Sequence, residues 1–114
     1  METLKLSRKD FDASLRYIHN ALNYEGHVEI EANLGVVFFQ SLSVKGYILA
    51  EAGSGIKAGE GIEAGSGIKA GLGIEAGWGI EAGSGIEAGW GIEAGSGIEA
   101  GSGIEAGWGI EAGS

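Results

Sequence analysis

The sequence predicts an all-β solenoid, a fold in which the chain winds through stacked coils of short parallel strands. The main observation is a hexapeptide, Gly-x-Gly-Ile-Glu-Ala, that repeats from Glu51 to Ser114 and places an isoleucine at every sixth position from Ile56 to Ile110. A period of six keeps the two-residue alternation of a strand but is out of step with a helix of about 3.6 residues per turn. One hexapeptide cannot bury its isoleucine, whereas stacked repeats give each isoleucine a neighbour above and below.

Residues 1–26 are expected to form an N-terminal cap. Thr3 to Leu6 is a candidate short strand, and the spacing of Ser7 and Asp10 is that of a capping box. An apolar residue then recurs at spacings of four, three and four: Phe11, Leu15, Ile18 and Leu22. This spacing puts the four side chains on one face of a helix. We therefore expect an α-helical cap that runs to about Asn23 and lies over one end of the β structure.

Residues 27–52 are expected to form the first, irregular strands of the solenoid. Nearly all even positions from Val28 to Ala52 are apolar, whereas the odd positions are more polar. The same parity continues into residues 53–114, so we expect one inward and one outward face throughout. Four large apolar or aromatic residues lie at odd, outward positions: Val37, Phe39, Tyr47 and Leu49. They would either form an exposed contact surface or pack under the cap.

The repeat unit, read as Ile-Glu-Ala-Gly-Ser-Gly, resembles the hexapeptide-repeat, left-handed β-helix family. The resemblance covers roughly residues 50–114, and it implies left-handed coils of about eighteen residues built from three hexapeptides. The spacing of the tryptophans by itself leaves a coil of twelve residues open. The x site of the repeat departs from the family, which has a small residue there, at five positions: Glu60, Leu72, Trp78, Trp90 and Trp108.

The x-site tryptophans and the glycines each permit two interpretations. By strand parity the tryptophans point inward, where one large residue beside serines suits a core of fixed cross-section. At corners they would instead form an exposed contact patch, with Leu72, Trp90 and Trp108 in one row and Trp78 on another corner. The glycines suggest corners with positive φ and close coil approach. A flexible linker is the alternative, against which stand the constant isoleucine spacing, the absence of proline and the three tryptophans.

The charge is concentrated in the repeat. The chain has a net charge of −9 with seven Lys or Arg and sixteen Asp or Glu, and no basic side chain follows Lys69. In coils of eighteen residues the outward positions form three columns, which start at Lys57, Glu63 and Lys69. Three glutamates per coil at a rise of about 4.8 Å give one negative charge per about 1.6 Å, close to the value of about 1.7 Å for duplex DNA. The predicted partner-binding residues are the glutamates of these columns: Glu63, Glu75, Glu81, Glu87, Glu93, Glu99, Glu105 and Glu111.

These columns predict a non-enzymatic binding protein that occupies the basic, nucleic-acid-binding surface of a partner. In strategy, not in motif, it is similar to pentapeptide-repeat DNA mimics and to acidic phage-encoded inhibitors of host defence nucleases. Such a surface repels nucleic acid and anionic membranes, so no direct nucleic acid or membrane partner is expected. The simpler interpretation is that the glutamates keep a repetitive sheet soluble. A third interpretation is self-assembly. A last coil at Trp108 and Ile110 without a cap would expose its strand edges, which would allow a homodimer or a filament.

Several other functions find no support in the sequence. The chain lacks cysteine and any bilayer-spanning apolar run, which favours a soluble, cytoplasmic protein. Acyltransferases of the hexapeptide-repeat family use a histidine near a cleft between coils, but His19 and His27 both precede the repeat and are expected to be structural. No zinc-ligand set, phosphate loop or nucleophile elbow is present, so we predict no catalytic residue, cofactor or metal.

Overall fold

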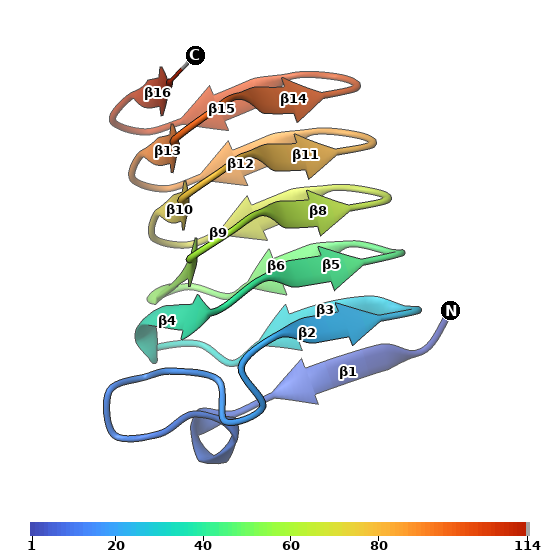
Figure 1. Cartoon of the computed structure of the whole chain (residues 1–114), viewed down its shortest axis with the longest axis vertical. Coiled ribbons are helices and arrows are strands. Elements are labelled where there is room, and N and C mark those ends of the chain that lie inside the picture. Colours follow the sequence, from blue (N-terminus) through green and yellow to red (C-terminus); the bar gives the residue numbers. More distant parts are fainter. Residues whose placement is uncertain (114) are drawn as a thin grey trace.

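The computed structural model describes residues 1–113, which wind into a solenoid with three faces, each a parallel sheet (Figure 1). Face 1 has the order β1 (Thr3–Leu6), β3 (His27–Ile30), β6 (Ile48–Ala50), β9 (Ile68–Ala70), β12 (Ile86–Ala88) and β15 (Ile104–Ala106). Face 2 has the order β4 (Gly35–Phe39), β7 (Ser54–Ala58), β10 (Ile74–Ala76), β13 (Ile92–Ala94) and β16 (Ile110–Ala112). Face 3 has the order β2 (Leu22–Tyr24), β5 (Leu42–Val44), β8 (Ile62–Ala64), β11 (Ile80–Ala82) and β14 (Ile98–Ala100).

The repeat coils contain eighteen residues, as the sequence predicts. Ile62 pairs with Ile80 on face 3, eighteen positions later, and the same offset recurs through the later pairs. The earlier coils are longer, since Leu42 pairs with Ile62, twenty positions later. The additional residues lie at the corner between faces 1 and 2, where Asn33, Gly35 and Gly53 have positive φ values of 63°, 88° and 82°. The prediction of an all-β solenoid is therefore confirmed.

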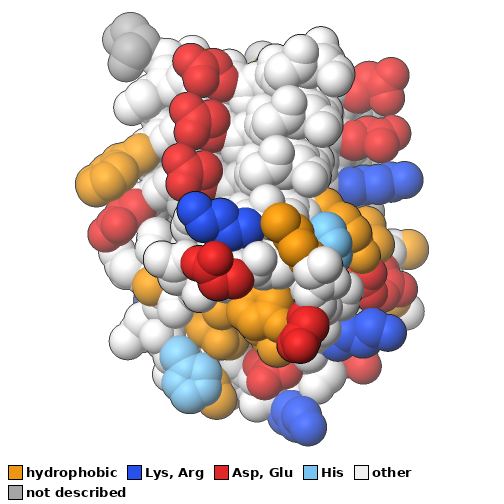
Figure 2. Space-filling view, turned by 90° about the vertical axis from the view of Figure 1, so that its right-hand side faces the viewer, with side chains coloured by type: hydrophobic (Ala, Val, Ile, Leu, Met, Phe, Trp, Pro, Cys, Tyr) orange, Lys and Arg blue, Asp and Glu red, His pale blue; other side chains and the backbone are white. Residues whose placement is uncertain are grey.

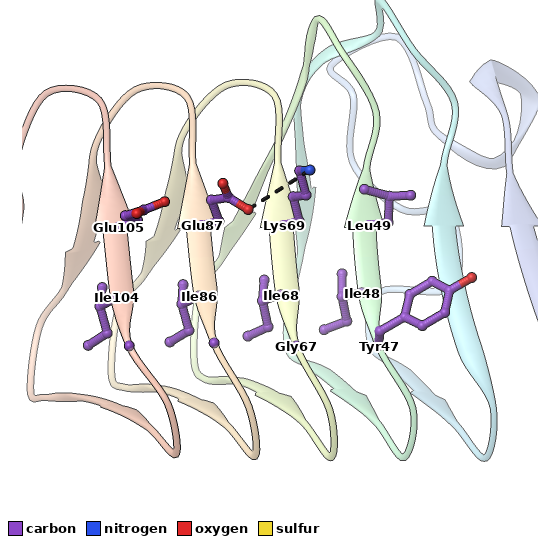
Figure 3. Close-up of a pocket in the computed structure, with 12 residues that line it drawn as sticks. Tyr47, Ile48, Leu49, Gly67, Ile68, Lys69, Ile86, Glu87, Ile104 and Glu105 are labelled. Carbon is purple, nitrogen blue, oxygen red and sulfur yellow. Dashed lines mark ion pairs between the residues drawn. The ribbon is translucent and has the colours of Figure 1, made fainter.

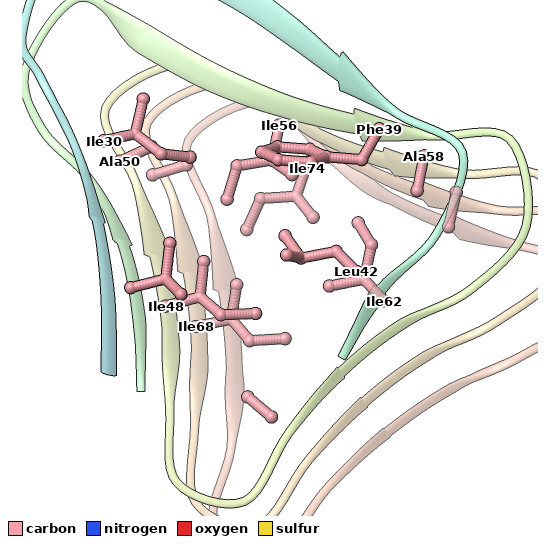
Figure 4. Close-up of a cluster of buried hydrophobic side chains, with 14 of the residues drawn as sticks. Ile30, Phe39, Leu42, Ile48, Ala50, Ile56, Ala58, Ile62, Ile68 and Ile74 are labelled. Carbon is pink, nitrogen blue, oxygen red and sulfur yellow. The ribbon is translucent and has the colours of Figure 1, made fainter. Parts of the chain in front are cut away.

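The core is a column of aliphatic side chains inside the three faces (Figure 4). Each three-residue strand of the repeat points its isoleucine and its alanine inward and its middle residue outward, as the alternation predicts. The isoleucines from Ile56 to Ile92 are all almost completely buried. Each isoleucine pairs with the isoleucine of the next coil, so these side chains bury one another in a continuous column along the stack.

The predicted inward parity is wrong at β4. Val37 and Phe39 are fully buried, whereas Val36 is exposed and Phe38 is partly exposed, so the odd positions of this strand point inward. The longer corner before β4 shifts the alternation by one residue, and the short corner between Phe39 and Leu42 restores it. Val37 and Phe39 therefore belong to the core rather than to an outward surface. Tyr47 and Leu49 remain on the outer face, where both are partly exposed.

The predicted N-terminal α-helix does not form. Within residues 1–26 the structure has strand β1, as expected, a single 3-10 turn η1 (Arg8–Asp10) and strand β2. Leu15 and Asn20 have φ values of 63° and 68°, which no right-handed helix accommodates. The aromatic rings of Phe11 and Tyr17 instead pack on Phe39 at centroid distances of 5.8 Å and 5.2 Å. The buried contacts of these two rings take the place of the expected apolar helix face. Ile18, one of the four residues expected on that face, is 52% exposed.

Residues 11–20 nevertheless lie over the N-terminal end of the solenoid, as a loop (Figure 1). The loop pairs with the free edge of β4, because Tyr17 N–H donates to Phe38 O and Phe38 N–H donates to Leu15 O, both at 2.8 Å. Asp12 shapes the loop by accepting from the N–H groups of Ser14 and Arg16 at 2.8 Å and 3.0 Å. These two bonds lower the pKa of Asp12. A strand edge that would otherwise be open is thereby covered.

The glycines of the repeat serve coil stacking, not positive φ. In residues 1–113 the glycines with positive φ are Gly35, before the repeat, and Gly53, which opens the first hexapeptide; the glycines of the later hexapeptides have none. From Gly65 onward, the glycine after each alanine faces the backbone of the preceding coil: a Cβ on Gly83 would overlap the carbonyl oxygen of Gly65. The glycine before each isoleucine is less confined, since a Cβ on Gly85 would lie 3.3 Å from the carbonyl oxygen of Gly103.

Candidate functional site

The predicted partner-binding glutamates form three ladders, one on the outside of each face. Strand pairing aligns them residue for residue, because the parallel register of each sheet places every outward residue over its equivalent one coil earlier. The face 1 ladder consists of Lys69, Glu87 and Glu105. The face 2 ladder consists of Lys57, Glu75, Glu93 and Glu111. The face 3 ladder consists of Glu63, Glu81 and Glu99.

The ladders become uniformly acidic toward the C-terminal coils. Figure 2 shows files of acidic side chains that run along the axis, with a basic side chain next to the N-terminal end of a file. The salt bridge found in residues 1–113 joins Lys69 and Glu87 at 3.9 Å, between two well exposed side chains. An exposed pair of this kind contributes little to stability. Most of the carboxylate charge therefore faces solvent without a counter-charge from this chain.

Close spacing perturbs the central carboxylates. Hydrogen bonding to the Glu63 carboxyl, and then to that of Glu99, raises the pKa of Glu81. Hydrogen bonding to Glu111, with repulsion from Glu75 and Glu111, raises the pKa of Glu93. Strands of adjacent coils lie about 4.8 Å apart, well within the Debye length of about 10 Å at 0.1 M salt. The carboxylates of neighbouring coils therefore repel one another, and a bound cationic partner would reduce this repulsion.

The tryptophans are exposed, so the interpretation that they point inward and fill the core is wrong. Trp78, Trp90 and Trp108 are 62%, 40% and 76% exposed. They stand at corners, and the rings of Trp90 and Trp108 stack with centroids 5.1 Å apart and planes 3° from parallel. The alternative row of Leu72, Trp90 and Trp108 is the arrangement found, with Leu72 partly buried beneath the stack. Apart from Ser54, which is buried in the first repeat, the side chains at the x site do not share the core, so their sizes need not balance within a coil.

Each face also carries a groove that sequence reasoning missed. Two residues of each hexapeptide point outward, the glutamate and the glycine before the isoleucine, and the glycine leaves a channel beside the glutamate ladder. The face 1 groove, about 560 Å³, lies along Lys69, Glu87 and Glu105, and Tyr47 stands at its N-terminal end (Figure 3). Two outward positions per repeat, one of them without a side chain, were visible in the sequence. Only the stacking of coils turns them into a continuous channel.

The grooves of faces 2 and 3 have an aromatic wall as well. On face 2 the groove measures about 520 Å³, with Trp90 and Trp108 on one side and Glu75, Glu93 and Glu111 on the other. On face 3 it measures about 390 Å³, with Trp78 facing Glu63, Glu81 and Glu99. The grooves thus differ in their aromatic content while their glutamate spacing is the same.

The predicted self-association residues lie in the last described coil. Trp108 is exposed, and Ile110 is 49% exposed, whereas Ile92, one coil earlier on the same face, is 1% exposed. Ile98 and Ile104 are partly exposed in the same coil. Strands β14, β15 and β16 each have a strand neighbour on one side. These edges and side chains are the ones that a second molecule would cover.

The histidines have structural contacts. His27 stacks on Tyr47 with ring centroids 4.1 Å apart, and its Nδ1 accepts a hydrogen bond from the Tyr47 N–H at 3.0 Å. His19 packs edge-on against Tyr17. Within residues 1–113 no group of three or more histidine or acidic side chains is placed to hold a metal ion. The described part of the chain also has no helix with the length and apolar character needed to cross a bilayer.

Comparison with known proteins gives no relative from which function can be transferred. No protein-family model, curated protein or solved structure matches the chain. The site must therefore be interpreted from its own chemistry.

Proposed function

We propose that this protein is a non-enzymatic acidic binder that occupies the nucleic-acid-binding surface of a basic partner protein, in the manner of a DNA mimic. The observation that carries the proposal is the alignment of glutamates in three exposed ladders, with no basic side chain after Lys69. One negative charge per about 1.6 Å of axis is close to the charge spacing of duplex DNA. A role as a phage-encoded anti-defence protein in the cytoplasm would fit this chemistry.

The alignment matters because a rigid array binds differently from a flexible acidic chain. Hydrogen-bonded strands hold each carboxylate at a fixed offset from the next, so a partner does not have to order the array on binding. Release of counterions from both surfaces would then drive association. Solubility alone requires negative charge, but it does not require charges in register.

The test is displacement of nucleic-acid-binding proteins from DNA. Proteins of the source cell would be bound to immobilised duplex DNA, and the purified solenoid would be added at rising concentration. We expect release of a small set of basic proteins, with an affinity that falls steeply as salt rises.

Two controls give this experiment its meaning. A polyglutamate of matched charge tests whether the ordered array is needed, and a variant with Glu75, Glu81 and Glu87 changed to glutamine tests whether the ladders act. Release by polyglutamate at equal charge concentration would contradict the DNA-mimic proposal. So would unchanged release by the glutamine variant.

A second candidate function is a self-assembling scaffold. The observation that favours it is the exposure of Ile110 and of the edges of β14, β15 and β16. At the N-terminal end the loop at Phe11 and Tyr17 covers the edge of β4, so one of the three faces is blocked there. Pairing of two C-terminal coils into a dimer is therefore favoured over a head-to-tail filament. Sedimentation velocity of the 114-residue chain tests this: a concentration-dependent dimer that Ile110→Glu abolishes is expected, and a monomer at all concentrations contradicts it.

A further inference from the structure

We propose that the face 2 groove is a binding site for an arginine-rich, extended segment of the partner. This inference rests on the proposed function, since it names the segment that the acidic surface would capture. It is drawn from the pairing of an aromatic stack with a carboxylate ladder across a floor without side chains. The groove is lined by Trp90, Trp108, Glu75, Glu93 and Glu111.

The dimensions of the groove suit a polypeptide side chain or an extended backbone. Two residues separate the tryptophan from the glutamate, as in Trp90-Gly91-Ile92-Glu93, and this offset of three positions spans at most about 10 Å at 3.3 Å per residue. The floor between the walls consists of Gly73, Gly91 and Gly109 together with the backbone of their isoleucines. A ligand can therefore lie along the solenoid axis and contact both walls in the coils of Trp90 and Trp108.

The two walls together select guanidinium. Indole is the best of the aromatic partners for a cation, and guanidinium also stacks on aromatic rings and bonds carboxylates with a planar fork of donors. The Trp90 and Trp108 rings stack on each other, so the inner faces of the pair are already covered. The outer face of Trp108, whose side chain is 76% exposed, remains open for a guanidinium to stack on. An ammonium group is a compact charge that uses the carboxylates but gains less from the aromatic wall. The predicted preference is thus arginine over lysine.

Charge and aromatic content together favour this groove over the other two. The groove on face 1 has no tryptophan among its lining residues and includes Lys69, which pairs with Glu87. The groove on face 3 is smaller and has a single tryptophan, Trp78. The lining of the face 2 groove has three carboxylates and no basic residue.

The experiment compares the binding of oligo-arginine and oligo-lysine peptides of equal length. A background with Trp78→Ser leaves Trp90 and Trp108 as the fluorescent reporters, and calorimetry gives the affinity independently. The repeat itself supplies serine at the x site at Ser84, Ser96 and Ser102, so tryptophan-to-serine changes preserve the solenoid. Circular dichroism checks that each variant is folded.

We expect oligo-arginine to bind several-fold more tightly than oligo-lysine. Trp90→Ser with Trp108→Ser should weaken oligo-arginine about tenfold and remove the preference over lysine. Glu93→Gln with Glu111→Gln should weaken binding more than Glu87→Gln with Glu105→Gln, which removes the same charge from face 1. Trp78→Ser alone should change affinity by less than about twofold.

Two outcomes would overturn the groove assignment: equal affinity for the two peptides, or unchanged oligo-arginine affinity in the variant lacking Trp90 and Trp108. Either result leaves the DNA-mimic proposal intact if displacement from DNA persists. Conversely, selective arginine binding without displacement would refute the mimic while keeping the groove. The two proposals therefore fail separately.

Discussion

At the scale of single residues, the two glycines of each hexapeptide have different roles. The glycine after the alanine touches the backbone of the preceding coil and leaves no room for a Cβ, as at Gly83 against Gly65. The glycine before the isoleucine forms the floor of a surface groove, as at Gly91. The first permits coils to stack at strand spacing, and the second opens the outer face to a ligand.

The first glycine role predicts a position-specific stability loss. Gly83→Ala should destabilise the protein by about 1–3 kcal/mol, because the new methyl group overlaps the Gly65 carbonyl and forces the coils apart. Gly103→Ala is the matched control, since a Cβ there meets no atom within 4 Å and the φ is not positive. That control should change stability by no more than about 0.5 kcal/mol. Urea unfolding measures both, and equal effects would contradict the stacking explanation.

At the scale of elements, β4 joins the irregular first coils to the cap. Its odd residues point inward, and Phe39 meets the rings of Phe11 and Tyr17. Its outer side holds Phe38, over whose ring the Arg16 guanidinium lies at 4.6 Å. The glutamate ladders also belong to the scale of elements, because the alignment of each ladder depends on the pairing of whole strands.

The inverted parity of β4 predicts unequal effects for adjacent phenylalanines. Phe39→Ala should cost about 3–5 kcal/mol, the range for a fully buried aromatic residue. Phe38→Ala should cost about 1 kcal/mol, from partial burial and the lost cation–π contact. Chemical denaturation of both variants is the measurement. A larger loss of stability for Phe38→Ala than for Phe39→Ala would indicate that the even positions of β4 point inward, and would contradict the register described.

The ladders predict that mild acid stabilises the fold. Folding raises the pKa values of Glu81 and Glu93, so the folded state holds protons more tightly than the unfolded chain. Melting temperature should therefore rise as pH falls from 7 toward 4.5, the ordinary glutamate value. Below 3.8 the trend should reverse, because the lowered pKa of Asp12 makes its protonation destabilising.

Thermal scans at low salt across this pH range provide the measurement. A variant with Glu81→Gln and Glu93→Gln is the control, and its melting temperature should vary less between pH 7 and 4.5. A continuous decrease in the melting temperature of the parent protein on acidification from pH 7 would show that repulsion within the ladders does not measurably lower its stability.

At the scale of the whole molecule, the solenoid is unequal along its axis. At the N-terminal end the loop around Phe11 and Tyr17 covers the edge of β4, while burial of the isoleucines declines toward Ile110. Coils interact with their nearest neighbours, so stability is approximately a sum of coil and interface terms. Within residues 1–113, the coil of β14, β15 and β16 contacts one neighbouring coil and has the least buried isoleucines of the repeat, so it should open most easily.

Hydrogen exchange of the dilute protein should therefore show a gradient. Amides of β14, β15 and β16 should exchange fastest, and protection should increase toward β8 and β9. Raising the protein concentration serves as the control, because a C-terminal dimer would protect these last strands selectively. Uniform protection at low concentration would indicate one cooperative unit and contradict the gradient.

The sequence by itself determined the solenoid, the coil length with the aid of the family resemblance, and the files of outward glutamates. It could do so because a strict six-residue period fixes which side chains alternate and which recur above one another. The aligned ladder of Glu75, Glu93 and Glu111 follows from this period alone once three repeats make a coil.

Only the tertiary structure decided the N-terminal loop, the parity of β4 and the exposure of the tryptophans. The four-three-four spacing of Phe11 to Leu22 fits a helix, but burial of Phe11 and Tyr17 on Phe39 outweighs that local preference. Trp90 keeps the inward parity in sequence yet stands at a corner, where the alternation of a strand no longer applies. Periodicity determines what lies along a strand, whereas the corners and the ends depend on contacts between residues distant in the chain.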